Sequence, residues 1–117
     1  MGQLTKNFRS EEFACRCGCG YDDINLELVR NLQKLRDLLG KPVRIISGCR
    51  CESHNAAVGG APNSFHMKGK AADITTKTIS PGALADYAED HIPAFENGGV
   101  GRYRGFVHLD IGPKRRW

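Results

Sequence analysis

The clearest helical pattern lies between residues 25 and 39, where leucines recur at steps of three and four residues. Such steps place apolar side chains on one face of a helix. Asp22 or Asp23 is placed to cap its start, and Gly40 with Pro42 would end it. We expect this helix to pack against the core through a stripe formed by Leu28, Leu32, Leu35 and Leu39.

Shorter patterns predict the remaining elements. Ser10 precedes two acidic residues and would cap a short helix, whereas Ser80 followed by Pro81 predicts a helix that runs to about His91. Residues 52–58 favour another short helix. Helices followed by mostly antiparallel strands indicate an α+β fold, with helices packed on a small, mainly antiparallel sheet. The expected strands are 43–47, 71–75, 100–103 and 106–111, of which the last two form a hairpin.

The chain has 117 residues, so we expect a single domain over residues 1–117. Its content of 40% hydrophobic and 26% charged residues is ordinary for a soluble globular protein. No apolar run approaches the roughly 20 residues of a membrane span. The first residues lack the apolar core of a signal peptide. We therefore expect a protein that is cytoplasmic until released, that leaves by another route, or that has lost a leader.

The formal net charge is +4, and part of the excess lies in Lys114, Arg115 and Arg116. A basic balance favours anionic partners, such as nucleic acid, acidic lipid or a cell-wall polymer. No aromatic residues are interleaved with these charges to stack on bases, so we expect no nucleic-acid partner. We interpret the basic run as a solvated tail.

Five cysteines lie in two short segments, Cys15-x-Cys17-x-Cys19 and Cys49-x-Cys51. In residues 15–20 cysteine alternates with arginine or glycine. This pattern supports neither a helix nor a strand and predicts a tight loop. The odd number excludes complete intramolecular pairing. We favour core packing, or one or two disulfides between the segments, over a thiolate zinc site, because such sites usually have C-x₂₋₄-C spacing.

His66, Asp73 and His108 are the candidate metal ligands. A catalytic zinc takes three protein ligands and keeps one position for water, and two imidazoles with one carboxylate suit that role. Asp73 falls within a short apolar strand, where an unpaired carboxylate is costly. Gly69 would let the backbone turn close to the ion, and Asp110 could act on the water or orient a ligand. The spacing alone leaves hydrogen bonding without a metal as an equal alternative.

One segment resembles the S-x-H-x₂-G-x-A-x-D signature of the zinc D-Ala-D-Ala carboxypeptidase family, with Ser64, His66, Gly69, Ala71 and Asp73 at its fixed positions. Members of this family and their endopeptidase relatives cut the stem peptides of bacterial peptidoglycan, and they share a core with the hedgehog signalling domain. The other segments that match are Asn7-Phe8 through Glu12-Phe13, Ile46-Ser47-Gly48-x-Arg50, Asn55 through Gly60, and Val107-His108-Leu109-Asp110-x-Gly112-x₃-Arg116-Trp117.

The resemblance implies one zinc ion per chain, held by His66, Asp73 and His108. It also implies that Arg50 binds a carboxylate of the stem peptide and assists catalysis, since a guanidinium matches a carboxylate through two parallel hydrogen bonds. Ser64 would bind substrate or hold its loop.

The sequence departs from the family at one position. Many members have Glu or Asp three residues before the last histidine ligand as the general base, but here that residue is Gly105, which cannot take a proton. The branch with His-x-Asp near a terminal tryptophan shares this arrangement, and Asp110 is our candidate for the base.

The resemblance implies a zinc metallopeptidase, a hydrolase that cleaves stem peptides or cross-links of peptidoglycan as a D,D- or L,D-type endopeptidase or carboxypeptidase. The small size resembles stand-alone bacterial or phage forms, such as endolysins, which act in the periplasm or cell wall. We expect a monomer. The alternatives are a non-catalytic, zinc-stabilised module that binds the wall or a protein, and a module whose cysteines hold the functional metal.

Overall fold

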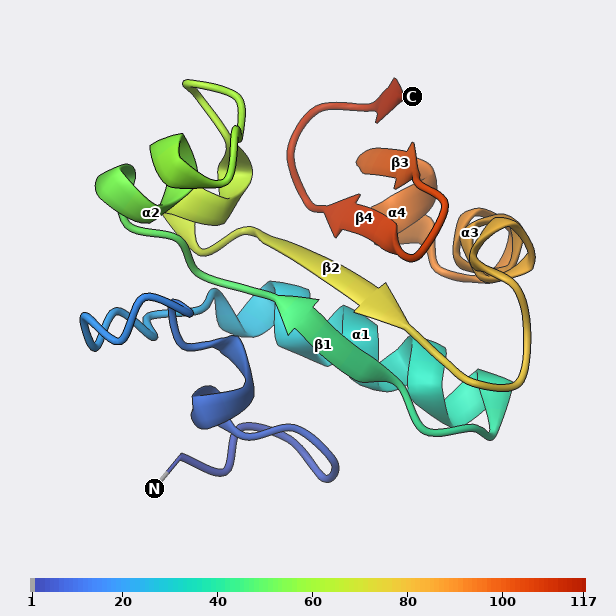
Figure 1. Ribbon diagram of the computed structural model, residues 1–117. Coiled ribbons are helices and arrows are strands. Elements are labelled where there is room, and N and C mark those ends of the chain that lie inside the picture. Colours follow the sequence, from blue (N-terminus) through green and yellow to red (C-terminus); the bar gives the residue numbers. More distant parts are fainter. Residues whose placement is uncertain (1) are drawn as a thin grey trace.

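A five-stranded sheet forms the centre of the structure, a computed structural model that describes residues 2–117 (Figure 1). The strand order is β1-β2-β4-β3-β5, and neighbours are antiparallel except β3 and β5. This confirms the expected α+β class with a mainly antiparallel sheet. The strands are β1 Arg44–Ser47, β2 Ala71–Thr75, β3 Gly99–Arg102, β4 Val107–Asp110 and β5 Arg115–Arg116.

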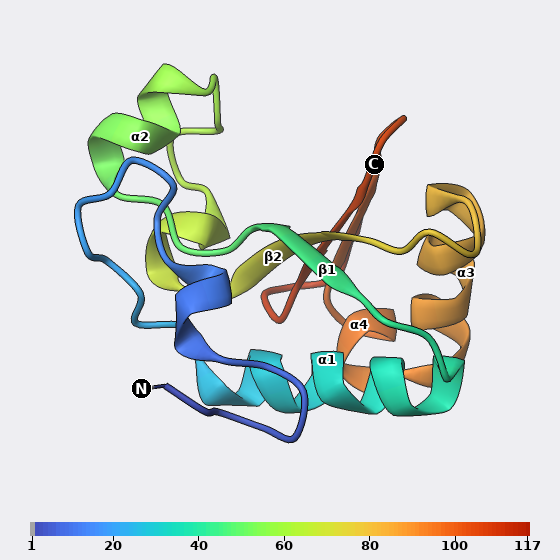
Figure 2. The ribbon, with the colours of Figure 1, turned by 60° about the horizontal axis from the view of Figure 1, so that its bottom comes forward.

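Among residues 2–117, four α-helices and two 3₁₀ turns pack around this sheet. Helix α1 runs along β1 and β2, whereas α3 and α4 lie beside β3 and β4 (Figures 1 and 2). Helix α2 and the turn η2 lie at the end of the sheet opposite α3 (Figure 2). No helix among residues 2–117 is long and apolar enough to cross a membrane. The bounds are η1 Ser10–Phe13, α1 Leu26–Leu39, α2 Glu52–Ala57, η2 Phe65–Lys68, α3 Pro81–His91 and α4 Pro93–Glu96.

Helix α1 packs on the core as its leucine stripe predicts. Leu28, Leu32 and Leu35 are fully buried. The helix begins differently from the prediction, because Asn25 rather than Asp22 or Asp23 caps it: the Asn25 side chain accepts hydrogen bonds from the first turn. Any of the three could cap by residue type; Asn25 is also held in place by its backbone N–H, which donates to the Gly69 carbonyl at 2.8 Å. The start of α1 is therefore tied to the segment that carries His66.

Helix α3 begins at Pro81 with Ser80 as its cap and ends at His91, which confirms the predicted bounds. The first short helix is instead a single 3₁₀ turn. It begins at Ser10 and its cap is Arg9, so the predicted Ser10 cap is wrong. The hairpin of β3 and β4 is confirmed.

The basic run is not a solvated tail. Arg115 and Arg116 form β5, which pairs with β3. Arg116 donates to the Gly98 carbonyl at 2.7 Å and pairs with Glu89 at 3.2 Å. The sequence prediction failed here because charge alone does not reveal partners that a strand pairing brings into reach. This strand places the residues that follow β4 against the site described below.

Candidate metal centre

Two neighbouring strands and one 3₁₀ turn carry the three predicted ligands. Strands β2 and β4 are antiparallel with Asp73 directly opposite His108, so their side chains leave the same face of the sheet. His66 comes from η2, which leads directly into β2. Gly69 ends η2 at φ +68°, and a Cβ there would lie 2.4 Å from the Asp23 carbonyl oxygen. Glycine is therefore required by a backbone contact with Asp23, and not, as the sequence suggested, by proximity to an ion.

The structure brings His66, Asp73 and His108 together in one buried cluster. Oδ1 of Asp73 lies 3.1 Å from His66 Nε2 and 3.2 Å from His108 Nδ1. One ligand atom from each residue lies within 4.8 Å of the other two. All three side chains are at least nine-tenths buried. Residues separated by 42 positions in sequence thus offer three donor atoms around one point.

Hydrogen bonds outside the cluster fix the tautomer of each imidazole. His66 Nδ1 lies 2.7 Å from the Gly48 carbonyl oxygen, which can only accept, so Nδ1 carries the proton. His108 Nε2 donates to Asp110 Oδ2 at 2.7 Å. The remaining nitrogen of each ring faces the Asp73 carboxylate: its lone pair can bind a metal ion when one is present, and the same nitrogen can donate a hydrogen bond to Asp73 when it carries a proton instead. Three converging lone-pair donors with such outer partners fit a bound metal cation.

The electrostatics of the cluster also favour a positive charge. Burial raises the pKa of Asp73, but hydrogen bonds from His108 and His66 and their charges outweigh it and bring the pKa to about 2. Burial lowers the pKa of His108, but hydrogen bonds to Asp110 and Asp73 outweigh it, so the net shift is upward. A group of this kind prefers a cation at its centre at neutral pH.

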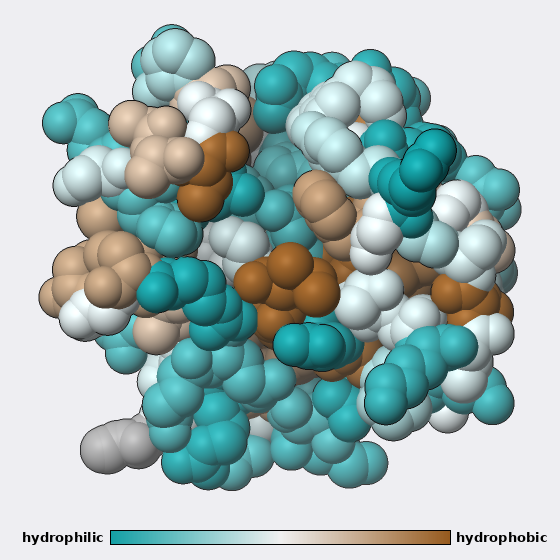
Figure 3. Space-filling view, in the orientation of Figure 1, coloured by the Kyte–Doolittle hydropathy of each residue, from teal (hydrophilic) through white to brown (hydrophobic). Residues whose placement is uncertain are grey.

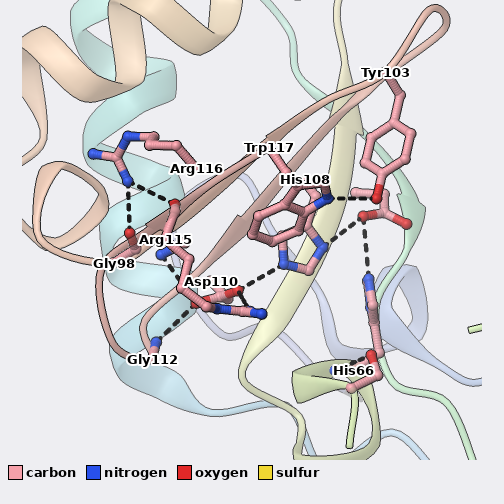
Figure 4. Close-up of polar contacts among 12 residues, drawn as sticks. His66, Gly98, Tyr103, His108, Asp110, Gly112, Arg115, Arg116 and Trp117 are labelled. Atoms are coloured by element: carbon pink, nitrogen blue, oxygen red, sulfur yellow. Dashed lines mark hydrogen bonds and ion pairs between the residues drawn. The ribbon is translucent and has the colours of Figure 1, made fainter. Parts of the chain in front are cut away.

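Asp110 is buried behind His108 and makes four hydrogen bonds. Its Oδ2 accepts from His108 and, at 3.1 Å, from Arg115. Its Oδ1 accepts from the backbone N–H groups of Gly99 at 3.0 Å and Gly112 at 2.9 Å. Figure 4 shows the His108 ring between Asp110 and the side of the cluster that holds His66. The carboxylate has no exposed surface, so the structure places it in contact with the histidine rather than with the cleft.

Arg50 and Ser64 both lie beside the cluster. Arg50 pairs with Asp73 Oδ2 at 3.0 Å and donates to Ser47 Oγ at 3.2 Å and Asn55 Oδ1 at 3.3 Å. Ser64 Oγ accepts from the His66 backbone N–H at 3.1 Å and so begins η2. Of the two roles that the sequence left open for Ser64, holding its loop is the one that its contacts show.

A cleft of about 580 Å³ opens over the three ligands. It lies between α2 with the loop that follows it and the part of the chain that contains β4 and β5, and Figure 3 shows the surface hollowed there. Asp73 is the sole acidic side chain in its lining among residues 2–117. Besides residues 58–63, the lining to which sequence reasoning gave no role consists of aromatic and basic side chains, namely Phe65, Tyr103, Phe106, Arg115 and Trp117.

Trp117 contacts several of the other residues on this aromatic and basic side of the cleft. Its ring centre lies 4.9 Å from that of His108, and its Nε1 donates to the Tyr103 hydroxyl at 2.6 Å (Figure 4). The Arg115 guanidinium lies over the indole at 4.7 Å. A Cβ at Gly101 would meet the same indole at 2.5 Å. The glycine in a strand was the available signal for this close approach, although it could not name the partner.

Comparison with known proteins agrees with this architecture. The sequence profile of the peptidase M15 family matches residues 6–110, and the chain belongs to this family. This confirms the resemblance inferred from the S-x-H-x₂-G-x-A-x-D signature.

Individual relatives carry peptidoglycan-related names. The peptidoglycan L,D-endopeptidase MepK of Escherichia coli K12 is 38% identical over 99 residues, which cover 77% of this chain and 52% of that protein. The probable peptidoglycan L,D-endopeptidase MepK of Haemophilus influenzae is 36% identical over 94 residues, covering 74% and 48%. The zinc D-Ala-D-Ala carboxypeptidase of Streptomyces albus G is 43% identical over 61 residues, covering 51% and 24%. The chain spans about half the length of the two MepK proteins.

Proposed function

We propose that this protein is a zinc-dependent peptidase that hydrolyses peptide bonds in the stem peptides or cross-links of peptidoglycan. The observation that carries the proposal is the convergence of three buried donor atoms, with both imidazole tautomers fixed so that their lone pairs meet at Asp73. Two nitrogens and one oxygen suit zinc, and three protein ligands leave a position free for catalysis. The peptidoglycan-related names of the relatives support the substrate class.

His66, Asp73 and His108 would hold the ion, one zinc per chain at this site. When bound there, zinc supplies a Lewis acid that polarises a carbonyl and lowers the pKa of water. The Gly48 carbonyl and Asp110 keep the two imidazoles in the tautomers and orientations that binding requires.

Arg50 would bind a substrate carboxylate. Three of its five N–H groups are taken by Ser47, Asn55 and Asp73, and each of these contacts uses a different nitrogen. The two terminal nitrogens therefore keep one N–H each, and Arg50 lines the cleft. Two such donors match a carboxylate in the bidentate geometry that gives strong and specific hydrogen bonds.

Tyr103 forms the opposite wall of the cleft. Because Trp117 Nε1 donates to its oxygen, the hydroxyl proton is free to be donated to a substrate oxygen. The cleft thus offers aromatic surface together with two guanidinium groups, those of Arg50 and Arg115, to a bound peptide.

We propose that Asp110 positions His108 rather than acting as the general base that the sequence suggested. Its four hydrogen bonds and complete burial support this role. A general base must be within hydrogen-bond reach of the proton that it abstracts, and Asp110 does not line the cleft.

We further propose that the chain works as a single-domain monomer at the cell wall or in the periplasm, where its substrate lies. A net charge of +4 favours contact with an anionic wall.

A second function, a zinc-stabilised module that binds wall fragments or a protein without cleaving them, is favoured by one observation. Gly105 occupies the position of the usual base, and Asp73 is the sole carboxylate lining the cleft among residues 2–117.

Digestion of purified peptidoglycan separates the two functions. Released fragments would be identified by mass before chelation, after chelation and after zinc is restored. Cleavage that chelation abolishes and zinc restores supports the peptidase, and the fragment masses name the bond. His66→Ala should lose this activity, whereas the exposed His91→Ala should keep it. Zinc binding with wall binding but no cleavage would contradict the peptidase and favour the binding module.

A further inference from the structure

A second cluster of metal-ligating side chains lies outside the His66–Asp73–His108 centre. It consists of the thiols of Cys15, Cys17, Cys19 and Cys51, whose sulfur atoms all lie within 4.8 Å of one another. All five cysteines are free in the structure, which shows none of the disulfides that the sequence offered as an alternative to core packing. We propose that these four thiols bind a structural zinc ion, which gives the protein two zinc sites of different chemistry.

The spacing of the sulfur atoms supports a single ion. Cys17 Sγ lies 3.4 Å from Cys15 Sγ and 3.6 Å from Cys51 Sγ. Four sulfurs at 2.3 Å around a tetrahedral zinc are roughly 3.8 Å apart. The cluster is therefore close to the size of a zinc–tetrathiolate site. Sulfur ligands in a tetrahedral set select zinc over magnesium or calcium, which prefer oxygen.

The backbone around the cluster is arranged as it is around metal-bound thiolates. Cys51 N–H points to Cys15 Sγ at 3.4 Å, and His54 N–H points to Cys51 Sγ at 3.4 Å. Hydrogen bonds from backbone N–H groups to sulfur stabilise negative charge on it. Gly18, which separates Cys17 from Cys19, has a φ of +84°, a backbone conformation that glycine adopts at little cost and that turns the chain between these two cysteines.

The fifth cysteine marks the boundary of the site. Cys49 is buried among core side chains and does not belong to the cluster. It acts as a small apolar residue. The odd number of cysteines, which argued against complete pairing, is thus accounted for by four ligands and one core residue.

A metal here would fix one wall of the cleft. Cys51 follows Arg50 directly and caps α2, so an ion would join the loop of residues 15–19 to the segment that carries the proposed substrate-binding arginine. The two segments are 34 residues apart at Cys17 and Cys51. The proposed site is structural, since four thiolates leave no open position for a substrate.

The test counts zinc per chain after the reduced, chelator-treated protein is reloaded with zinc and freed of excess. The full chain should bind two zinc ions. Cys17→Ser with Cys51→Ser should bind one, and His66→Ala should bind one. Cys49→Ala is the matched control and should bind two. The cysteine variants thus test this site, whereas His66→Ala tests the centre of the proposed function separately.

Cobalt loading gives a readout on the wild-type protein itself, so the test does not depend on whether a variant folds. The wild-type protein and His66→Ala should both show the intense thiolate-to-cobalt charge-transfer absorption, and the Cys17→Ser, Cys51→Ser variant should lose it. One zinc per wild-type chain without that absorption would overturn the proposal. Disulfides joining Cys51 to the residue 15–19 loop, found by mass spectrometry of protein purified without reductant and retained after zinc loading, would overturn it as well.

Discussion

Replacement of Asp110 by asparagine should weaken metal binding at the histidine centre while leaving the shape of the side chain unchanged. Asp110 accepts on one oxygen from His108 and Arg115 and on the other from the N–H groups of Gly99 and Gly112. An asparagine can keep its oxygen on one side only. In either orientation its NH₂ group faces donors, so a buried hydrogen bond is lost.

The magnitude follows from these contacts. A buried polar group left without its partner costs about 1–3 kcal/mol. The lost hydrogen bond is restored most easily if His108 changes its tautomer. Nε2 then accepts from the asparagine NH₂ group, and the ring proton moves to Nδ1, the atom that faces Asp73. That tautomer cannot bind a metal through Nδ1. We expect zinc affinity at this centre to fall about 10–100-fold, as is typical when an outer partner of a histidine ligand is removed.

The assay is a zinc titration against a chromophoric chelator. It is made in the Cys17→Ser, Cys51→Ser background so that the thiols do not compete for the ion. The control is Asp86→Asn, which changes an exposed carboxylate that pairs with Arg102. If Asp110→Asn kept full zinc affinity but lost hydrolysis, the positioning role would be refuted and a role in proton transfer favoured.

Three further predictions follow from the same contacts. Measured at saturating zinc, Arg50→Lys should lower kcat/KM roughly tenfold or more, because an ammonium cannot replace the bidentate fork; an unchanged KM would contradict this. In metal-free protein, the pKa of Asp73 falls from 3.8 to about 2 on folding, so about 2 kcal/mol of stability is present above pH 4 and lost towards pH 2. Denaturant titrations should show the free energy of unfolding falling over this pH range, and Asp73→Asn should make it nearly independent of pH there. Gly69→Ala should lower the free energy of unfolding by at least about 1 kcal/mol, because of its positive φ and the Asp23 carbonyl, whereas Gly82→Ala, where a Cβ meets nothing within 4 Å, should not; denaturant titrations of both variants measure this.

Much of the fold could be predicted because local patterns determine it. The leucine stripe of α1, the Ser80-Pro81 start of α3 and the apolar segment of β2 all agree with the structure. The parallel pairing of β5 with β3 could not be predicted, because two arginines carry no strand pattern. Their place depends on Glu89 and the Gly98 carbonyl, which are distant in sequence.

Part of the candidate site could likewise be predicted from the sequence, and part of it could not. Asp73 and His108 could be recognised because these residue types are unusual in short apolar strands, and His66 because it shares a family signature with Asp73. The role of Asp110 was open because residues two apart on a strand point to the same face. From the sequence, the Asp110 side chain could therefore either contact His108 or reach into the cleft. The sequence allowed Cys51 to meet the residue 15–19 loop, as disulfides between the two segments, but it could not show that Cys49 alone turns into the core, since that depends on packing in three dimensions.

The most direct test of the central claim is anomalous diffraction at the zinc edge from crystals of the zinc-loaded protein. We expect a peak about 2.0–2.2 Å from His66 Nε2, Asp73 Oδ1 and His108 Nδ1. A second peak among the four thiols is predicted by the further proposal. A zinc-loaded crystal with no peak between the two histidines and Asp73 would contradict the assignment of the metal centre.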